Sequence, residues 1–161
     1  GVNEVTLFRK FKTKNLLLEA AKNRGAINFL EELEELLKID PESDIQTYLR
    51  TIWKNSSNMI DKRTNLIRIA MEEVRGVSFE NKVLPKISKM VLDNLTVYFK
   101  YQIAKGSIRN IDPEVAALNF FSIVFQMNMM WKIYGQNPLV EDERCLENFL
   151  DIFMNGILVN K

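Results

Sequence analysis

The chain of 161 residues has no histidine and only one cysteine, Cys145. The first absence excludes Ser-His-Asp triads and zinc sites built on imidazole, and a single thiol cannot form a thiolate zinc cluster. Cys145 also cannot form a disulfide within the chain, which fits a reducing cytosol and the role of a small buried hydrophobic residue. The six glycines are scattered, and no glycine-rich phosphate-binding loop occurs. We therefore expect no metal or cofactor site.

Adjacent carboxylates occur at positions 31–32, 34–35 and 72–73. Neighbouring residues on a helix do not face each other, so these pairs indicate solvated charged faces rather than an acid and base acting together. Together with the missing histidine, this pattern does not indicate an enzyme.

Long hydrophobic runs are missing as well. The most apolar segment, residues 115–131, is interrupted by polar residues at positions 119, 122, 126 and 128. A membrane span needs about 20 mainly apolar residues, so this segment is too interrupted to be one. No signal peptide is visible. We expect a cytoplasmic protein with no membrane partner.

The charges are unevenly distributed, although the net charge is only +1. Residues 1–24 hold six Lys or Arg against two Glu, a net charge of +4, whereas residues 25–44 hold one Lys against seven carboxylates, a net charge of −6. Phosphates attract a basic end and repel an acidic block. The beginning of the chain is therefore the part suited to nucleic acid, and the acidic block should point away from it.

The first fourteen residues have the pattern of the second half of a helix-turn-helix: a turn, a short recognition helix and the start of the next helix. Asn3 is a good N-cap for the short helix. Apolar residues at positions 2, 7 and 11 repeat at helical spacing and would face inward, which leaves Thr6, Arg9 and Lys10 toward a ligand. Thr13 can cap the following helix. An ordinary short surface helix is the alternative interpretation.

This stretch resembles the TetR family of bacterial transcriptional repressors, whose pattern it matches at Gly1, Val2, Thr6, Leu7, Phe11, Lys14 and Leu17. Phe8 departs from the pattern, because the family usually has a Tyr there whose hydroxyl reaches a DNA phosphate, a hydrogen bond worth about 1 kcal/mol. Glu4 departs too, since phosphates repel a carboxylate unless it accepts from a cytosine amino group. The resemblance implies that the DNA-binding residues are Asn3, Glu4, Val5, Thr6, Phe8, Arg9, Lys10 and Lys14.

A helix-turn-helix needs its first helix. The resemblance therefore implies that the first two helices of the DNA-binding domain precede Gly1, and that the chain without them binds DNA poorly.

The rest of the chain has helical patterns throughout, without strand alternation or a hairpin signal. We predict helices over about residues 16–40, 44–60, 64–75, 78–105, 112–134 and 141–159. Pro85 lies in the first two turns of the fourth, where it bends the helix entry or marks a later start. Asp112 caps the fifth, with Pro113 at its first position.

The predicted helix over residues 112–134 is apolar nearly all round, because three of its polar residues share one narrow strip. Its apolar side chains must therefore be covered on two sides. The last helix carries an apolar stripe as well. We expect one surface of this pair to meet its own domain and the other to meet a second copy of the chain. The residues assigned to this dimer interface are Phe120, Val124, Met127, Trp131, Leu146, Phe149, Leu150 and Phe153.

Residues 106–117 also resemble the TetR family, at the loop and helix start that open its penultimate helix. The resemblance implies that the last two helices form a four-helix dimer interface and that the middle helices enclose an effector pocket. The candidates for lining this pocket are Trp53, Met71, Asn94, Tyr98, Phe121 and Phe125. For each of them a place in a solid core is the alternative.

The sequence therefore predicts an all-α, TetR-like fold, with a partial helix-turn-helix in residues 1–24 and an effector-binding and dimerisation domain in residues 25–161. The predicted function is a ligand-responsive transcriptional regulator, a repressor that binds palindromic double-stranded operator DNA as a homodimer. An unknown small-molecule effector, apolar or aromatic, would release it. The alternative is a helical interaction or ligand-binding module that does not bind DNA.

Overall fold

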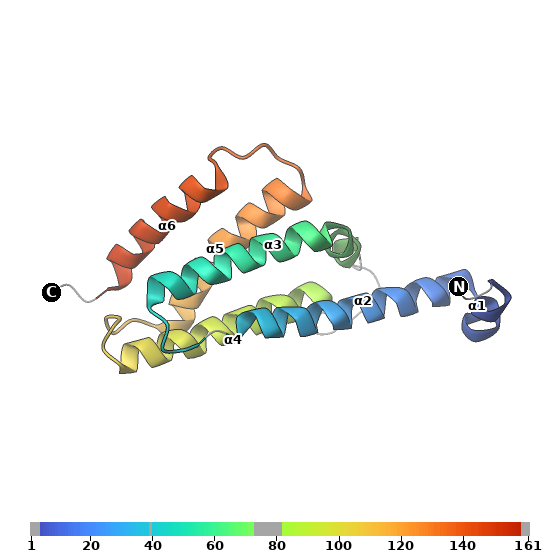
Figure 1. The fold of residues 1–161 in the computed structure, drawn as a ribbon, viewed down its shortest axis with the longest axis horizontal. Coiled ribbons are helices and arrows are strands. Elements are labelled where there is room, and N and C mark those ends of the chain that lie inside the picture. Colours follow the sequence, from blue (N-terminus) through green and yellow to red (C-terminus); the bar gives the residue numbers. More distant parts are fainter. Residues whose placement is uncertain (1–3, 39, 73–81, 159–161) are drawn as a thin grey trace.

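The computed structural model describes residues 4–38, 40–72 and 82–158. These residues form helices and no named strand, so the prediction of an all-α fold is confirmed (Figure 1). The helices are α1 (Glu4–Phe11), α2 (Lys14–Leu37), α3 (Ile45–Glu72), α4 (Val83–Ala104), α5 (Pro113–Met127), the π-helix η2 (Asn128–Ile133) and α6 (Asp142–Ile157).

Two predicted helix starts are confirmed by their hydrogen bonds. The side chain of Thr13 accepts from the backbone N–H of Leu16 at 3.2 Å. The side chain of Asp112 accepts from the N–H groups of Glu114 and Val115 at 2.9 and 3.1 Å, and Pro113 follows at the first helical position. Both caps satisfy N–H groups that have no partner within their helix. The predicted cap Asn3 lies outside the described residues.

The prediction of separate helices over residues 44–60 and 64–75 is confirmed for the described residues, because α3 (Ile45–Glu72) consists of two helical stretches that meet at a break in helical geometry. Residues 73–75 lie outside the described residues. Helix α3 is kinked at Arg63, whose backbone is non-helical (φ −126°, ψ 17°). The side chain of the next residue, Thr64, donates to the carbonyl of Ile60 at 2.9 Å, a bond that competes with the backbone ladder and bends helices. The predicted break is therefore a kink.

Two helices differ from the prediction at their ends. The described part of α4 begins at Val83, which places Pro85 in the first turn, where its missing N–H costs no hydrogen bond. The predicted α-helix over residues 112–134 ends as an α-helix at Met127 and continues as the π-helix η2.

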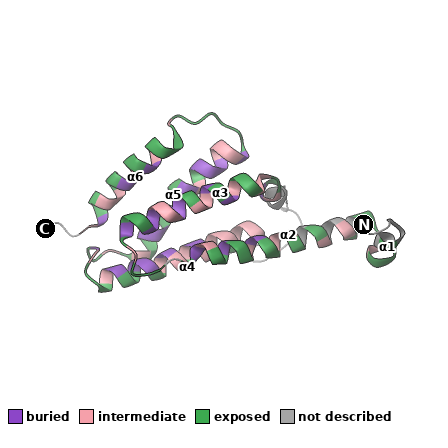
Figure 2. Cartoon of the chain, in the orientation of Figure 1, coloured by how far each residue is buried: buried purple, intermediate pink, exposed green. Residues whose placement is uncertain are grey.

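The molecule has a helical body with one long extension. Helix α2 runs from the body to α1, which lies at the far end of the molecule (Figure 1). The buried side chains gather where α2, α3, α4, α5 and α6 meet, whereas α1 is mostly exposed where its burial is described (Figure 2). Leu49, Leu95, Phe99, Ala117 and Phe120 are completely buried. No helix of the described residues is long and apolar enough to cross a membrane.

Candidate functional site

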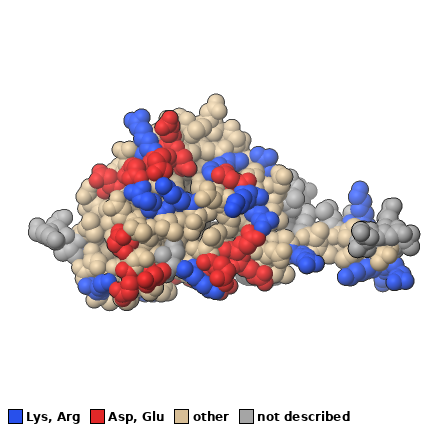
Figure 3. Space-filling view, viewed as in Figure 1, with Lys and Arg blue, Asp and Glu red and all other residues tan. Residues whose placement is uncertain are grey.

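The end of the molecule formed by α1 and the start of α2 is basic. The side chains of Thr6, Arg9, Lys10 and Lys14 are exposed, and cations gather at this end in the space-filling view (Figure 3). The predicted residues Glu4, Val5 and Phe8 lie on α1, but their side chains are not described, and Asn3 is outside the described residues. The described cations thus lie on the element predicted to read DNA.

A tight turn sets the direction of α1 relative to α2. The backbone of Lys12 is left-handed (φ 59°), and the N–H of Thr13 donates to the carbonyl of Phe11 at 2.6 Å. The Lys10 ammonium lies 5.5 Å from the centre of the Phe11 ring, within cation–π distance.

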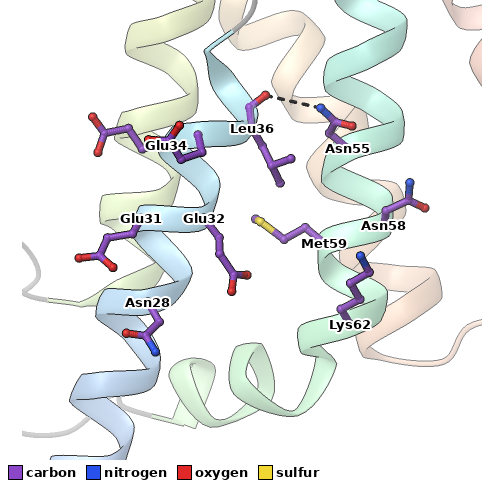
Figure 4. A pocket seen from close by; sticks show the side chains of 10 residues that line it. Asn28, Glu31, Glu32, Glu34, Leu36, Asn55, Asn58, Met59 and Lys62 are labelled. Carbon is purple, nitrogen blue, oxygen red and sulfur yellow. Dashed lines mark hydrogen bonds between the residues drawn. The ribbon is translucent and has the colours of Figure 1, made fainter.

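The α2 part of the acidic block, residues 31–35, lies in the body, away from α1 (Figure 1). Together with α3 it lines an open groove of about 980 Å³. Figure 4 shows Met59 and Glu32 facing this gap, and Glu31 and Glu34 on the side of α2 away from α3. Glu32 is paired with Arg63, and Glu35 is paired with Lys38 at 2.6 Å. Two of the four glutamates that line the groove are therefore paired with cations.

A partly open apolar cavity of about 50 Å³ lies in the body. It has space for one or two water molecules, so a larger ligand requires the lining to move. The lining comes from α2, α3, α4, α5 and η2, and it consists of Phe29, Leu33, Ser56, Met59, Ile60, Ile67, Leu84, Ile87, Val91, Phe121, Val124, Phe125, Asn128 and Met129. None of these side chains carries a charge, and the two methionines are flexible enough to yield.

Of the residues predicted for the effector pocket, Phe121 and Phe125 line this cavity and three others do not. Trp53 packs between α3 and α6, where its Nε1 donates to Asp142 Oδ1 at 3.2 Å. Tyr98 donates its hydroxyl to the carbonyl of Ser43, and Asn94 donates to the carbonyl of Met90. Trp53 thus joins α3 to α6, Tyr98 joins α4 to the segment before α3, and Asn94 bonds within α4. The side chain of Met71 is not described.

Most of the lining, including Phe29, Met59 and Asn128, was not predicted from the sequence. Phe29 and Met59 look like ordinary core residues, because nothing in a single sequence shows which helix faces meet around a void. Asn128 did leave a signal, since it is a polar residue at the end of an apolar helix. It is 4% exposed.

A polar network beside the cavity begins at the buried residues Ser57 and Asn128 and ends at the exposed residues Asp61 and Asp142. Ser57 lies 3.4 Å from both Asn128 Oδ1 and Asp142 Oδ2 through its hydroxyl. Lys132 Nζ donates to the carbonyl of Ser57 at 3.2 Å and to Asp61 at 2.6 Å. The network therefore joins α3 to η2 and to the first residue of α6.

The predicted dimer residues lie mostly inside the protomer, which corrects their assignment. Phe120, Val124, Met127, Leu146 and Leu150 are buried within a single chain. Phe149 and Phe153 are half-buried, with ring centres 5.8 and 5.9 Å from that of Phe120, and Trp131 is half-buried as well. The apolar stripe found in the sequence is thus mainly the face that the helices turn toward their own body.

The outer face of α5 and α6 carries a different set of apolar residues. Val115 and Leu118 are each 52% exposed, Ile123 is 37% exposed, and Ile152 is 72% exposed. A shallow groove of about 360 Å³ separates the start of α5 from the end of α6. We call the surface formed by these four residues the association face.

The chain has the fold of the TetR-family transcriptional regulators. It aligns with PfmR, a TetR-family regulator of Thermus thermophilus, at a TM-score of 0.64 and 15% identity, over 96% of this chain and 82% of that one. A Clostridium perfringens protein described as a fatty acid metabolism regulator aligns at 0.64 and 16%, over 99% and 84%. No protein-family model and no curated protein matches the sequence.

A third similar structure is AibR in complex with isovaleryl coenzyme A and operator DNA. It aligns at a TM-score of 0.59 and 22% identity, over 91% of this chain and 77% of that one.

Proposed function

We propose that this protein is a ligand-responsive transcriptional regulator, a repressor that binds operator DNA as a homodimer and is released by a small apolar effector. Residues 1–24 belong to its DNA-binding domain, and residues 25–161 form the effector-binding and dimerisation domain. The observation that carries the proposal is the exposed basic surface of α1 and the start of α2, held at the tip of a TetR-like body.

The charge distribution supports DNA binding at this tip. Phosphate contacts come from exposed Lys and Arg side chains, and α1 presents Arg9 and Lys10 while α2 begins with Lys14. The α2 part of the acidic block lies farther along this helix, where it does not oppose phosphates. AibR, which shares the fold, has been captured with operator DNA.

The cavity supports an apolar effector. Its lining is uncharged, so it suits an alkyl, acyl or aromatic group rather than an ion. The isovaleryl coenzyme A bound by AibR includes such a branched acyl group. The effector of this protein would act by binding the DNA-incompetent arrangement more tightly than the competent one.

The association face supports a two-fold dimer. Its four exposed apolar residues lie on the two last helices of the chain, and a stable specific interface buries on the order of 1,600 Å² in total. Two helices from each protomer can cover such an area. A dimer with this symmetry places two copies of α1 on one face, as a palindromic operator requires.

The test is a selection of duplexes from a random DNA library by the protein expressed from its complete coding sequence. The proposal predicts an enriched palindrome with half-sites about one helical turn apart. If no sequence is enriched and binding to DNA stays at the non-specific level, the proposal fails. The chain would then be a helical ligand-binding or interaction module instead.

A further inference from the structure

One serine stands between the cavity and the last helix. Ser57 on α3 is 6% exposed, and its Oγ lies 3.4 Å from Asn128 Oδ1 and 3.4 Å from Asp142 Oδ2. Asn128 lines the cavity, and Asp142 is the first residue of α6. A hydroxyl has a single proton to donate. Ser57 can therefore donate fully to the cavity side or to the α6 side, but not to both.

The geometry leaves both alternatives open, because the two distances are equal. Both distances exceed the 2.7–2.8 Å usual for O–H···O hydrogen bonds, so neither acceptor holds the proton strongly. The backbone of Ser57 is fixed, because Lys132 donates to its carbonyl. The alternatives thus differ by a rotation of the hydroxyl, a local change that a ligand in the cavity can bias.

Asn128 has hydrogen-bonding capacity to spare. Its Nδ2 donates to the carbonyl of Val124 at 2.8 Å, and its Oδ1 faces the Ser57 hydroxyl. A carboxamide offers two N–H groups and two lone pairs, so one of each remains. Ser56 is the other polar residue in a lining that contains no charged side chain. An ion in the cavity would be unpaired, whereas a neutral polar group could bond to Asn128.

We propose that the cavity binds an uncharged apolar molecule with one hydrogen-bond donor, such as a hydroxyl, and that Asn128 Oδ1 accepts from this donor. The ligand uses the remaining lone pair of Asn128 Oδ1, which makes this oxygen a weaker acceptor for Ser57, and the Ser57 hydroxyl turns to Asp142. Asp142 already accepts from Trp53 Nε1, so it gains a second donor and the start of α6 is held more firmly. This inference rests on the effector role proposed above for the cavity.

The consequence reaches the association face. Helix α6 carries Ile152, a residue of that face, so a change in how α6 is held alters how two protomers meet. A new hydrogen bond at Asn128 is thereby linked to the geometry of the dimer, which sets the distance between the two copies of α1.

The first test compares two isomers as probes, 1-hexanol and butyl ethyl ether. They have the same atoms, but the ether has no donor. Calorimetry should show that the protein binds the alcohol about tenfold more tightly, the value of one hydrogen bond. In Asn128→Leu, which keeps a similar volume, the preference should fall below about twofold. Hexanoate, which is ionised at neutral pH, should bind more weakly than the alcohol.

The second test uses Trp53 as a reporter of Asp142 in a Trp131→Phe background. Binding of 1-hexanol should shift the Trp53 emission. Ser57→Ala should abolish this shift while leaving the affinity for the alcohol within about threefold. Ser56→Ala is the matched control, because it removes the hydroxyl of the cavity lining and should preserve the shift. If Asn128→Leu does not fold, the inference is tested by the wild-type preference for the alcohol over the ether and by the loss of the emission shift in Ser57→Ala.

Several results would overturn the inference: equal affinities for alcohol and ether, a preference that survives in Asn128→Leu, an emission shift that survives in Ser57→Ala, or no binding of either probe. If one of these results is found and the protein also binds DNA sequence-specifically, this inference fails and the proposed regulator stands. A clear preference for the alcohol without DNA binding removes the proposed regulator and keeps the ligand site.

Discussion

Tyr48 and Tyr98 stack face to face between α3 and α4, with ring centres 3.5 Å apart and an interplanar angle of 1°. Burial raises the pKa of Tyr48 to about 12, and burial also raises the pKa of Tyr98. The ordinary tyrosine pKa is about 10. Above pH 10 the unfolded chain therefore releases phenolic protons that the folded chain keeps.

The first prediction concerns this pair. The free energy of unfolding should be unaffected by these groups below pH 10 and should fall between pH 10 and about 12, because the unfolded state binds fewer protons in this window. Denaturant titrations at pH 9 and pH 11 measure the fall. Tyr48→Phe should make it smaller, and an equal fall in both proteins would contradict the assignment.

A second prediction concerns a single cap. Asp112→Ala should lower the free energy of unfolding by about 1 kcal/mol, because the first N–H groups of α5 lose their acceptor. Asp93→Ala is the control, since Asp93 is an exposed carboxylate whose ion pair with Lys89 is worth about 0.5 kcal/mol or less. Equal losses for the two variants would mean that the cap contributes nothing specific.

At the scale of single residues, the sequence predicted what depends on local chemistry. Thr13 and Asp112 were recognised as caps because a capping side chain acts within three residues of its own position. Tyr98 and Trp53 were predicted to line the effector pocket, but they bond to Ser43 and Asp142. These partners lie 55 and 89 positions away in the sequence, so a local pattern does not reveal them. Periodicity shows that such a side chain is buried but does not show what it touches.

At the scale of elements, the two last helices show where sequence patterns are ambiguous. The apolar girth of residues 115–131 indicated two sides that need cover, but it did not distinguish the face toward the body from the face toward a proposed partner. Phe120 is fully buried in its own protomer, whereas Leu118, two positions earlier, is 52% exposed. The distinction depends on packing against α3 and α4, which are distant in sequence.

The third prediction tests the association face. Leu118→Arg or Ile152→Arg should convert a dimer into a folded monomer, because an unpaired charge would be buried in the interface while the body stays intact. Light scattering should give twice the 18.8 kDa of the chain for the wild type and 18.8 kDa for these variants, with unchanged helical circular dichroism.

Val97→Arg is the matched control, since Val97 is an exposed apolar residue of α4 outside the association face. Its mass should equal that of the wild type. A monomeric wild type at micromolar concentration would contradict the proposed dimer, and so would a dimer that tolerates both charges.

At the scale of the whole molecule, three regions with different chemistry are arranged along one body: a basic tip on α1, an uncharged cavity, and an exposed apolar face on α5 and α6 (Figures 1 and 3). The contrast between the basic first 24 residues and the acidic block was visible in the sequence, and the structure places the two at different parts of α2. The cavity was not visible, because a void is a property of several helices together.

The central claim is that the basic tip binds DNA. The most direct measurement is the operator affinity of the complete protein with Arg9, Lys10 and Lys14 changed together to Ala, as a function of salt. We predict a loss of at least about tenfold, and a smaller dependence of log affinity on log salt, by about 0.9 for each phosphate contact removed.

The control is the triple change of Lys86, Lys89 and Lys100 to Ala, which removes three exposed cations from α4 instead. Because these cations lie outside the proposed contact, this variant should bind within about threefold of the wild type and keep its salt slope. Unchanged affinity and slope in the α1–α2 variant, or equal losses in both variants, would contradict the claim.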